Sequence, residues 1–423
     1  MRLRAILVLT LLLAVAPGAL AAPPANVIAD AGPAPNFIAA PALAAQSDLG
    51  GWHVAAWVGP VEGEPGVHDV FTRPLAFHGD PYADPVRIGM EGVAGPPSVI
   101  GDAIAIAYHE QEEGFVVSYV ASRREGTRYS AVVRAQRVDD DGRPDRPVAD
   151  LSERRVASRP PDGLATAHDF GSDRTLVVWR EPNAIVGRLV AWDGTTVGEA
   201  MRLTRPGDRG LGSPAVVARP DGRGFVVAWA DFRRHGSTVI ARNVSDGGVV
   251  GRPFQVPLKD GTGSRPAFGR VLFVSLAADY RNRLAIAWES EDARRDSTEV
   301  RAQLLSGDGR RARGRSLAIS GHQDERRNRR PRITHGGRDD IFTVAWEDRL
   351  SGCSHTALRY RRIRHTWSVV GPRAGSLTQR QDPGGIPIAC PQDPLRHWVE
   401  GGADLEGFVG LWLSGQRLLS AHR

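Results

Sequence analysis

The chain has 423 residues, of which 41% are hydrophobic, 24% are charged, 48 are glycine and 30 are proline. This composition fits many short strands joined by turns and argues against a helical bundle. The formal net charge is +6, and Lys259 is the only lysine, so a coding bias toward arginine explains the basic balance better than nucleic-acid binding does.

The N-terminal segment has the pattern of a secretory signal peptide. Arg2 and Arg4 precede an apolar run from Ala5 to Ala16, and small residues at 19–21 form a cleavage site. The run is short for a membrane span, although an uncleaved anchor is the alternative. We therefore expect residues 1–21 to be removed and the protein to reach the periplasm, the cell surface or the extracellular medium.

An aromatic residue ends a short apolar stretch seven times in the mature chain. These anchors are Trp57, Tyr119, Trp179, Trp229, Trp288, Trp346 and Trp412. The stretches before them, such as FVVAW at 225–229, are typical of strands buried on both faces. The anchors lie 50 to 66 residues apart, a spacing that indicates repeated small sheets of the propeller type.

The repeat is clearest around Trp229, where strands are expected near 214–218, 225–229, 238–244 and 250–256. An Asp-Gly pair joins the last two, because glycine accepts the positive φ of a tight hairpin. We predict an all-β fold for residues 22–423: a single seven-bladed β-propeller of four-stranded antiparallel blades. The predicted blades cover residues 42–90, 103–151, 164–204, 214–257, 272–320, 331–377, and 397–423 together with 26–30.

The last blade lacks a fourth strand, because only residues 417–423 follow the strand that contains Trp412. Residues 26–30 can supply it from the other end of the chain. This pairing would close the ring and remove exposed strand edges, so we expect a ring closed by the N-terminal strand. Two separate smaller domains are the alternative.

The repeat resembles a family of secreted bacterial propeller repeats in which an apolar strand ends in Trp-x-Asp-x-Arg and a later strand carries Ala and Arg. The matches are Trp229-Ala-Asp231-Phe-Arg233 with Ala241-Arg242, the looser Trp346-Glu347-Asp348-Arg349, and Trp288-Glu289 with Val300-Arg301-Ala302. The resemblance implies display or binding outside the cytoplasm, not a reaction.

The two cysteines are predicted to form a disulfide. Cys353 and Cys390 fall in loops expected on one face of neighbouring blades, and an exported protein favours their oxidation. Metal binding by this pair is the weaker alternative. The acidic run at 139–141 is explained by its hairpin turn, with calcium as the alternative. We therefore expect no cofactor and no metal.

Charged residues that follow the aromatic anchors, and an arginine-rich connection before Pro331, are expected to gather on one face. The candidate ligand-binding residues are Asp231, Arg233, Arg234, Glu289, Asp292, Arg326, Arg327, Arg329, Arg330, Asp348 and Arg349, with Glu291 and Glu347 beside them. Paired carboxylates could hydrolyse a glycoside, and arginines could clamp a carboxylated sugar. The alternative is that these side chains lock neighbouring blades together, and their repetition favours it.

The main functional prediction is an exported, non-enzymatic binding or scaffold module that holds a protein or a glycan through its loop-rich face. An anionic partner would bind in a salt-sensitive way. The alternatives are a sialidase-like, glycan-cleaving hydrolase and, more weakly, a binder of anionic polymer or nucleic acid. Two carboxylates and an arginine converging on one pocket would support an enzyme, whereas pairing between blades would support a scaffold.

Overall fold

The computed structural model describes most of the chain between Asn26 and His422. The described residues are 26–30, 39–45, 52–64, 67–76, 79–89, 103–109, 113–206, 208, 211–232, 238–258, 270–292, 297–320, 326–336, 341–350, 356–364, 366–369, 374–376, 399–403, 408–414 and 417–422. The predicted signal peptide, Cys353 and Cys390 lie outside these residues. Among the described residues, no helix is long and apolar enough to cross a membrane.

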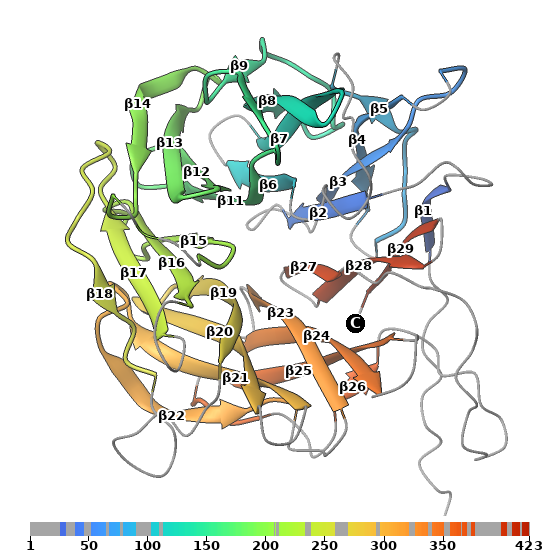
Figure 1. Ribbon diagram of the computed structural model, residues 1–423. Helices are drawn as coiled ribbons and strands as arrows, with labels where there is room; N and C mark the ends of the chain where they lie inside the picture. Colours follow the sequence, from blue (N-terminus) through green and yellow to red (C-terminus); the bar gives the residue numbers. More distant parts are fainter. Residues whose placement is uncertain are drawn as a thin grey trace, which may run out of the picture.

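The described strands form six sheets arranged about a common centre (Figure 1). Neighbouring strands in these sheets are antiparallel, apart from β21 (Ser297–Ser306) and β23 (Arg326–Gly336). The first four in chain order hold β2 (Ala39–Ala45), β3 (His53–Pro60), β4 (His68–Leu75) and β5 (Val86–Arg87); β6 (Ile104–His109), β7 (Gly114–Glu125), β8 (Arg128–Val138), β9 (Ala149–Asp150) and β10 (Arg155–Ala157); β11 (Asp162–Asp169), β12 (Arg174–Glu181), β13 (Ala184–Ala191) and β14 (Thr196–Arg202); and β15 (Ala215–Ala218), β16 (Phe225–Asp231), β17 (Thr238–Val244) and β18 (Phe254–Gln255).

The fifth sheet has eight strands and the sixth has four. The fifth holds β19 (Val271–Asp279), β20 (Arg283–Asp292), β21 (Ser297–Ser306), β22 (Ala312–Ala318), β23 (Arg326–Gly336), β24 (Ile341–Leu350), β25 (Thr356–Arg364) and β26 (Gly375–Ser376), and the sixth holds β1 (Asn26–Asp30), β27 (Val399–Ala403), β28 (Phe408–Ser414) and β29 (Arg417–His422).

In the repeats whose burial the structure describes, the second strand is buried on both faces, as the apolar stretches predict. Every residue of β16 is buried, and Trp179, Trp288 and Trp346 are each at most 1% exposed. Side chains from both faces of these strands pack against neighbouring sheets and form the core between them. The prediction of an all-β propeller built from short antiparallel strands is therefore confirmed.

The prediction of a closed ring of seven separate four-stranded blades is wrong, because the described strands form six sheets and one of them is continuous over eight strands. The two halves of that sheet are joined where Thr298 of β21 pairs in parallel with Arg327 of β23. Asn328 strengthens the joint: its Nδ2 donates to the carbonyl of Thr298 at 3.1 Å, and the Thr298 hydroxyl donates to the Asn328 carbonyl at 2.7 Å. Polar side chains that satisfy backbone groups on both strands make this merger possible.

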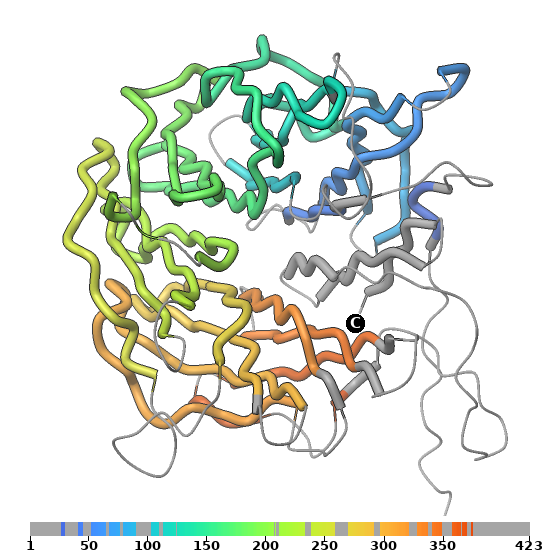
Figure 2. The backbone as a smooth tube through the Cα atoms, viewed as in Figure 1, coloured from blue at the N-terminus to red at the C-terminus, as the bar shows by residue number. Residues whose placement is uncertain are grey.

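The two ends of the chain lie in the same sheet. β1 pairs antiparallel with β29, from Asn26 opposite Ser420 to Asp30 opposite Arg417, and the strand order is β1, β29, β28, β27. The other edge strand, β27, lies beside both β2 and β23. Figure 2 shows the backbone path from the first sheet around to the eight-stranded sheet.

Candidate functional site

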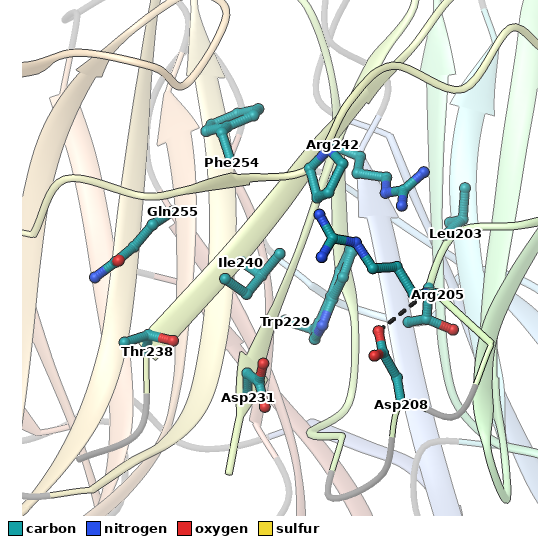
Figure 3. A pocket seen from close by; sticks show the side chains of 12 residues that line it. Leu203, Arg205, Asp208, Trp229, Asp231, Thr238, Ile240, Arg242, Phe254 and Gln255 are labelled. Atoms are coloured by element: carbon teal, nitrogen blue, oxygen red, sulfur yellow. Dashed lines mark hydrogen bonds between the residues drawn. The ribbon is translucent and has the colours of Figure 1, made fainter. Parts of the chain in front are cut away.

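A pocket of about 200 Å³ lies between the sheet of β11–β14 and the sheet of β15–β18 (Figure 3). We call it the intersheet pocket. Its lining residues are Leu203, Thr204, Arg205, Asp208, Trp229, Asp231, Thr238, Ile240, Arg242, Pro253, Phe254 and Gln255. The lining combines two carboxyl groups, two guanidinium groups and aromatic rings, which is the mixture of apolar walls and few convergent polar groups that small-molecule sites use.

Asp231 is the sequence-predicted residue in this pocket. It is the last residue of β16, two positions after Trp229, and it is 4% exposed. Ile240 pairs with Trp229 on the neighbouring strand β17, and Thr238 pairs with Asp231. An apolar strand therefore delivers a carboxyl group to the pocket directly beside a buried indole ring.

Asp208 is a second carboxyl group that the sequence did not single out. It lies in the connection after β14, is 7% exposed, and its Oδ2 accepts a hydrogen bond from the backbone nitrogen of Arg205 at 2.9 Å. In Figure 3, Asp208 and Asp231 lie on either side of Trp229 at the same end of the pocket. The position of Asp208 in the sequence could have indicated its role. It lies in the connection between the last strand of one repeat and the first strand of the next, and such connections lie on the same face as the loop that follows the anchor strand.

The two arginines of the pocket come from different sheets. Arg242 lies on β17 opposite Val227, and its Nη1 donates to the carbonyl of Gly251 at 3.3 Å. Burial lowers the pKa of Arg242, the nearby positive charge of Arg205 lowers it further, and the negative charge of Asp208 acts in the opposite direction. Arg205 follows β14 and its side chain is exposed. The pocket thus holds two positive charges within electrostatic range of each other.

A different group of predicted residues gathers inside the eight-stranded sheet. We call Glu289 of β20 and Glu347 of β24 the glutamate pair; they are 4% and 9% exposed. The backbone nitrogen of Arg330 donates to Glu289 Oε2 at 3.1 Å, and Arg330 Nη1 lies 3.5 Å from Glu347 Oε1. These contacts link successive parts of the sheet, which is the blade-locking role.

Burial raises the pKa of both members of the glutamate pair. Burial raises the pKa of Glu289 to about 7, although the hydrogen bond from Arg330 and the charges of Arg329 and Arg330 lower it. Burial likewise raises the pKa of Glu347 to about 7; the charge of Arg330 lowers it and that of Glu289 raises it. Neither glutamate lines the intersheet pocket.

The structure also places the other predicted residues. Asp348 accepts a hydrogen bond from Arg359 Nε at 3.3 Å, so it pairs within its own sheet. Arg326 and Arg327 begin β23 and do not lie in a connecting loop, which corrects the prediction, since the strand starts five residues before Pro331. Asp292 ends β20 and Arg349 lies in β24, and only their backbone is described. Arg233 and Arg234 lie outside the described residues.

A second cavity, of about 170 Å³, lies among the inner strands of the sheets. Its walls come from β2, β6, β11, β15, β19 and β23, and they are mainly apolar. Arg332 is its one charged lining residue among those described, and its guanidinium lies 4.6 Å from the centre of the Phe273 ring. A cavity with no carboxyl group in its described lining offers no acid–base pair. The described part of the chain contains no group of three or more His, Cys, Asp or Glu side chains that could hold a metal ion.

Comparison with known proteins gives similarity of fold. No family model and no curated protein sequence matches the chain. Among solved structures, a GH93 α-L-arabinofuranosidase of Fusarium graminearum has 11% identity and a TM-score of 0.47, with 76% of this chain and 92% of that chain covered. A Penicillium chrysogenum α-L-arabinanase has 13% identity and a TM-score of 0.45, with 94% and 97% covered. The propeller domain of the trilobed protease from Pyrococcus furiosus has 10% identity and a TM-score of 0.46, with 91% and 93% covered.

The prediction of a non-enzymatic binding module is corrected at this point. Two of these three similar structures are glycan-cleaving enzymes, and their sequence identities of 11% and 13% limit the likeness to the propeller fold. The intersheet pocket brings two carboxyl groups and two arginines together, which is the convergence expected to support an enzyme. The contacts that join neighbouring repeats are made instead by the glutamate pair and Arg330.

Proposed function

We propose that the protein is a glycan-cleaving hydrolase whose acid–base pair is Asp208 and Asp231. The observation that carries this proposal is that both carboxyl groups line one pocket beside Trp229 and the two arginines (Figure 3). Glycoside hydrolysis generally uses two carboxyl groups, one on each side of the scissile bond. Asp231 and Asp208 flank the same indole ring from two different sheets, which is a suitable frame for a sugar ring.

The surroundings of each carboxyl group suggest its role. Asp208 accepts a hydrogen bond from the backbone N–H of Arg205 and lies within electrostatic range of Arg242, contacts that suit a proton acceptor. Asp208 is therefore assigned as the base, which leaves Asp231 as the acid. In the reaction, Asp231 gives a proton to the leaving oxygen as the glycosidic bond breaks, and Asp208 takes a proton from the water that adds to the anomeric carbon.

The size of the pocket limits how much of the substrate it can enclose. A volume of about 200 Å³ is below the ~300–1,000 Å³ of sites for drug-sized ligands. It would hold one sugar unit and leave the remainder of the glycan outside. We therefore propose cleavage of a terminal residue.

The test compares two aspartates at matched positions. Asp231 and Asp348 each stand two residues after an anchor tryptophan, but only Asp231 lines the pocket, while Asp348 pairs with Arg359. Asp231→Asn should lower kcat/KM on aryl glycosides and glycans by roughly 10²–10⁴-fold, and Asp348→Asn should leave it within a factor of two. Circular dichroism and melting temperature establish that both variants are folded.

Two results would overturn the proposal. One is a folded wild-type protein that releases no sugar from any member of a panel of α- and β-linked aryl glycosides and plant, bacterial and animal glycans. The other is equal activity in wild type and Asp231→Asn. The anomeric configuration of the product, followed by NMR, checks the assigned role of Asp208, because a retained configuration would make it a nucleophile.

A further inference from the structure

The two arginines of the intersheet pocket have no carboxylate partner among the described residues, unlike several half-buried arginines of the protein. Arg180 binds both oxygens of Asp162, at 2.6 and 2.7 Å, and Arg283 Nε donates to Asp279 at 2.5 Å. Within the described residues, neither Arg205 nor Arg242 has a carboxylate within ion-pair distance of its guanidinium. The Nε of Arg242 is buried and makes no hydrogen bond to any described group.

Arginines at the same strand register as Arg242 make a hydrogen bond to the preceding sheet. Arg73 and Arg188 occupy the same position, opposite the residue two before the anchor tryptophan. Arg73 Nη1 donates to the carbonyl of Ile28 at 2.6 Å, and Arg188 Nη1 donates to the carbonyl of Leu151 at 3.2 Å, each in the preceding sheet. Among the described residues, Arg242 makes no such bond to the preceding sheet, and its guanidinium borders the pocket instead.

Two like charges in a partly buried pocket are costly unless a negative group joins them. Burial is the main cause that lowers the pKa of Arg242, the charge of Arg205 lowers it further, and the charge of Asp208 acts in the opposite direction with a smaller effect. A guanidinium group presents its N–H donors in a planar fork that fits a carboxylate at two points. A carboxylate brought in by a ligand would therefore satisfy the open donors and remove the repulsion.

We infer that the sugar unit taken by the intersheet pocket carries a carboxylate, so that the substrate class is uronic-acid-bearing glycans. This inference rests on the proposed function and specifies its substrate. Arg205 and Arg242 would bind the carboxylate, while Asp208 and Asp231 face the scissile bond at the other end of Trp229. Figure 3 shows this division, with the two guanidinium groups at one end of the pocket and the two aspartates at the other.

The best variant to test this is Arg242→Gln, because glutamine already occupies the same register elsewhere. Gln136 and Gln303 stand opposite the residue two before their anchors, and Gln303 Nε2 donates to the carbonyl of Gly314 at 3.0 Å, as Arg242 does to Gly251. Glutamine should therefore fold there while removing the charge. Arg188→Gln is the matched control, since Arg188 lies outside the pocket.

Titration calorimetry with glucuronate, galacturonate, glucose, galactose and glucose 6-sulfate measures the preference directly. Wild type should bind a uronate at least tenfold more tightly than the neutral sugar, and Arg242→Gln should weaken uronate binding by about 10- to 100-fold with little effect on the neutral sugar. Arg188→Gln should bind as wild type does. Added salt should weaken uronate binding only.

The outcomes separate this inference from the proposed function. Hydrolysis of neutral glycosides that depends on Asp231, without any preference for uronates, would overturn the inference and keep the function. Uronate binding that depends on Arg242, without hydrolysis of any glycoside, would keep the inference and overturn the function. Equal binding of the sulfated sugar would overturn the carboxylate assignment in favour of anions in general, and unchanged uronate affinity in Arg242→Gln would overturn it outright.

Discussion

The intersheet pocket and the glutamate pair contain similar residues, but only the residues of the pocket border a cavity that a ligand could enter. Each includes an acidic residue one or two positions after an anchor tryptophan and has arginines nearby. In the pocket the acids face a cavity of about 200 Å³, whereas Glu289 and Glu347 are closed in between strands of one continuous sheet. The comparison teaches that Trp-x-Asp and Trp-Glu motifs do not carry a function by themselves; the neighbouring sheet decides whether a ligand can reach them.

The register explains part of this difference. Residues one position after the anchor point to the opposite face of the strand from residues two positions after it. Arg180, one position after Trp179, donates to the carbonyl of Leu211 in the next sheet, and Glu289, one position after Trp288, accepts from the backbone of Arg330. Position one therefore serves contacts between successive repeats. Position two, occupied by Asp231, lies beside the pocket.

The largest expected effect on the structural side of the comparison is that of Asn328→Ala. Its side chain accepts from Trp346 Nε1 at 2.9 Å and donates to the Thr298 carbonyl, in a site where Asn328 is 3% exposed. Removing it leaves two buried polar groups without partners, so the free energy of unfolding should fall by about 2–5 kcal/mol. Urea unfolding measures this change.

The control for Asn328→Ala is the same substitution at Asn243. The side-chain oxygen of Asn243 is buried without a hydrogen bond to any described group, so Asn243→Ala should cost much less. If the two variants lose equal stability, the joint between β21 and β23 does not depend on Asn328. Glycoside hydrolysis by folded Asn328→Ala should stay near the wild-type rate, because the pocket belongs to other sheets.

The glutamate pair should make stability depend on pH in a predictable direction. The pKa of each glutamate is about 7 in the folded protein, against an ordinary value of 4.5, so the folded state binds more protons than the unfolded state between these two pH values. The contribution of the protonated glutamate pair to stability is therefore fully present below about pH 4.5 and is lost as the pH rises through about 7. A pKa raised from 4.5 to about 7 corresponds to about 3 kcal/mol for one glutamate, so the loss for the pair should be on the order of 3–6 kcal/mol.

Glu347→Gln mimics the protonated form and tests this pH dependence. The variant should match wild type near pH 5 and exceed its free energy of unfolding near pH 8 by roughly 1–3 kcal/mol. Glu199→Gln, at an exposed position on β14, should leave the profile unchanged. A profile of Glu347→Gln parallel to that of wild type from pH 5 to 9 would show that Glu347 does not hold a proton in the folded state.

The sequence predicted the strands well because their burial leaves a local trace. Apolar stretches before Trp179, Trp229, Trp288 and Trp346 mark strands that are buried on both faces, and the structure has a strand at each. The number of separate sheets was predicted wrongly, because one contact between Thr298 and Arg327 merges two repeats. A single backbone pairing of this kind leaves no periodic pattern.

The candidate site was predicted only in part for a similar reason. Asp231 was found because it follows an anchor, but Asp208 and Arg205 lie after β14 in another sheet, 23 and 26 residues before it in the sequence. Their meeting depends on how two sheets pack. Arg242 appears in the repeat motif, yet its open donors became visible only by comparison with Arg73 and Arg188.

The smallest expected effect comes from Arg330→Ser, which separates charge from packing at the glutamate pair. The Arg330 side chain is 51% exposed, its Nη1 lies 3.5 Å from Glu347 Oε1, and the backbone N–H that binds Glu289 remains in the variant. An exposed ion pair contributes about 0–1 kcal/mol, so the loss should stay below ~1 kcal/mol. The charge of Arg330 lowers the pKa of Glu347, so removing the arginine should raise this pKa further. The loss should accordingly be found near pH 9, where Glu347 is ionised, and vanish near pH 5.

Arg143→Ser, which removes the exposed pair with Asp141 on a distant hairpin, is the control and should show no such difference between the two pH values. An equal loss at pH 5 and pH 9 in Arg330→Ser would mean that the arginine supports the joint by packing and not by its charge.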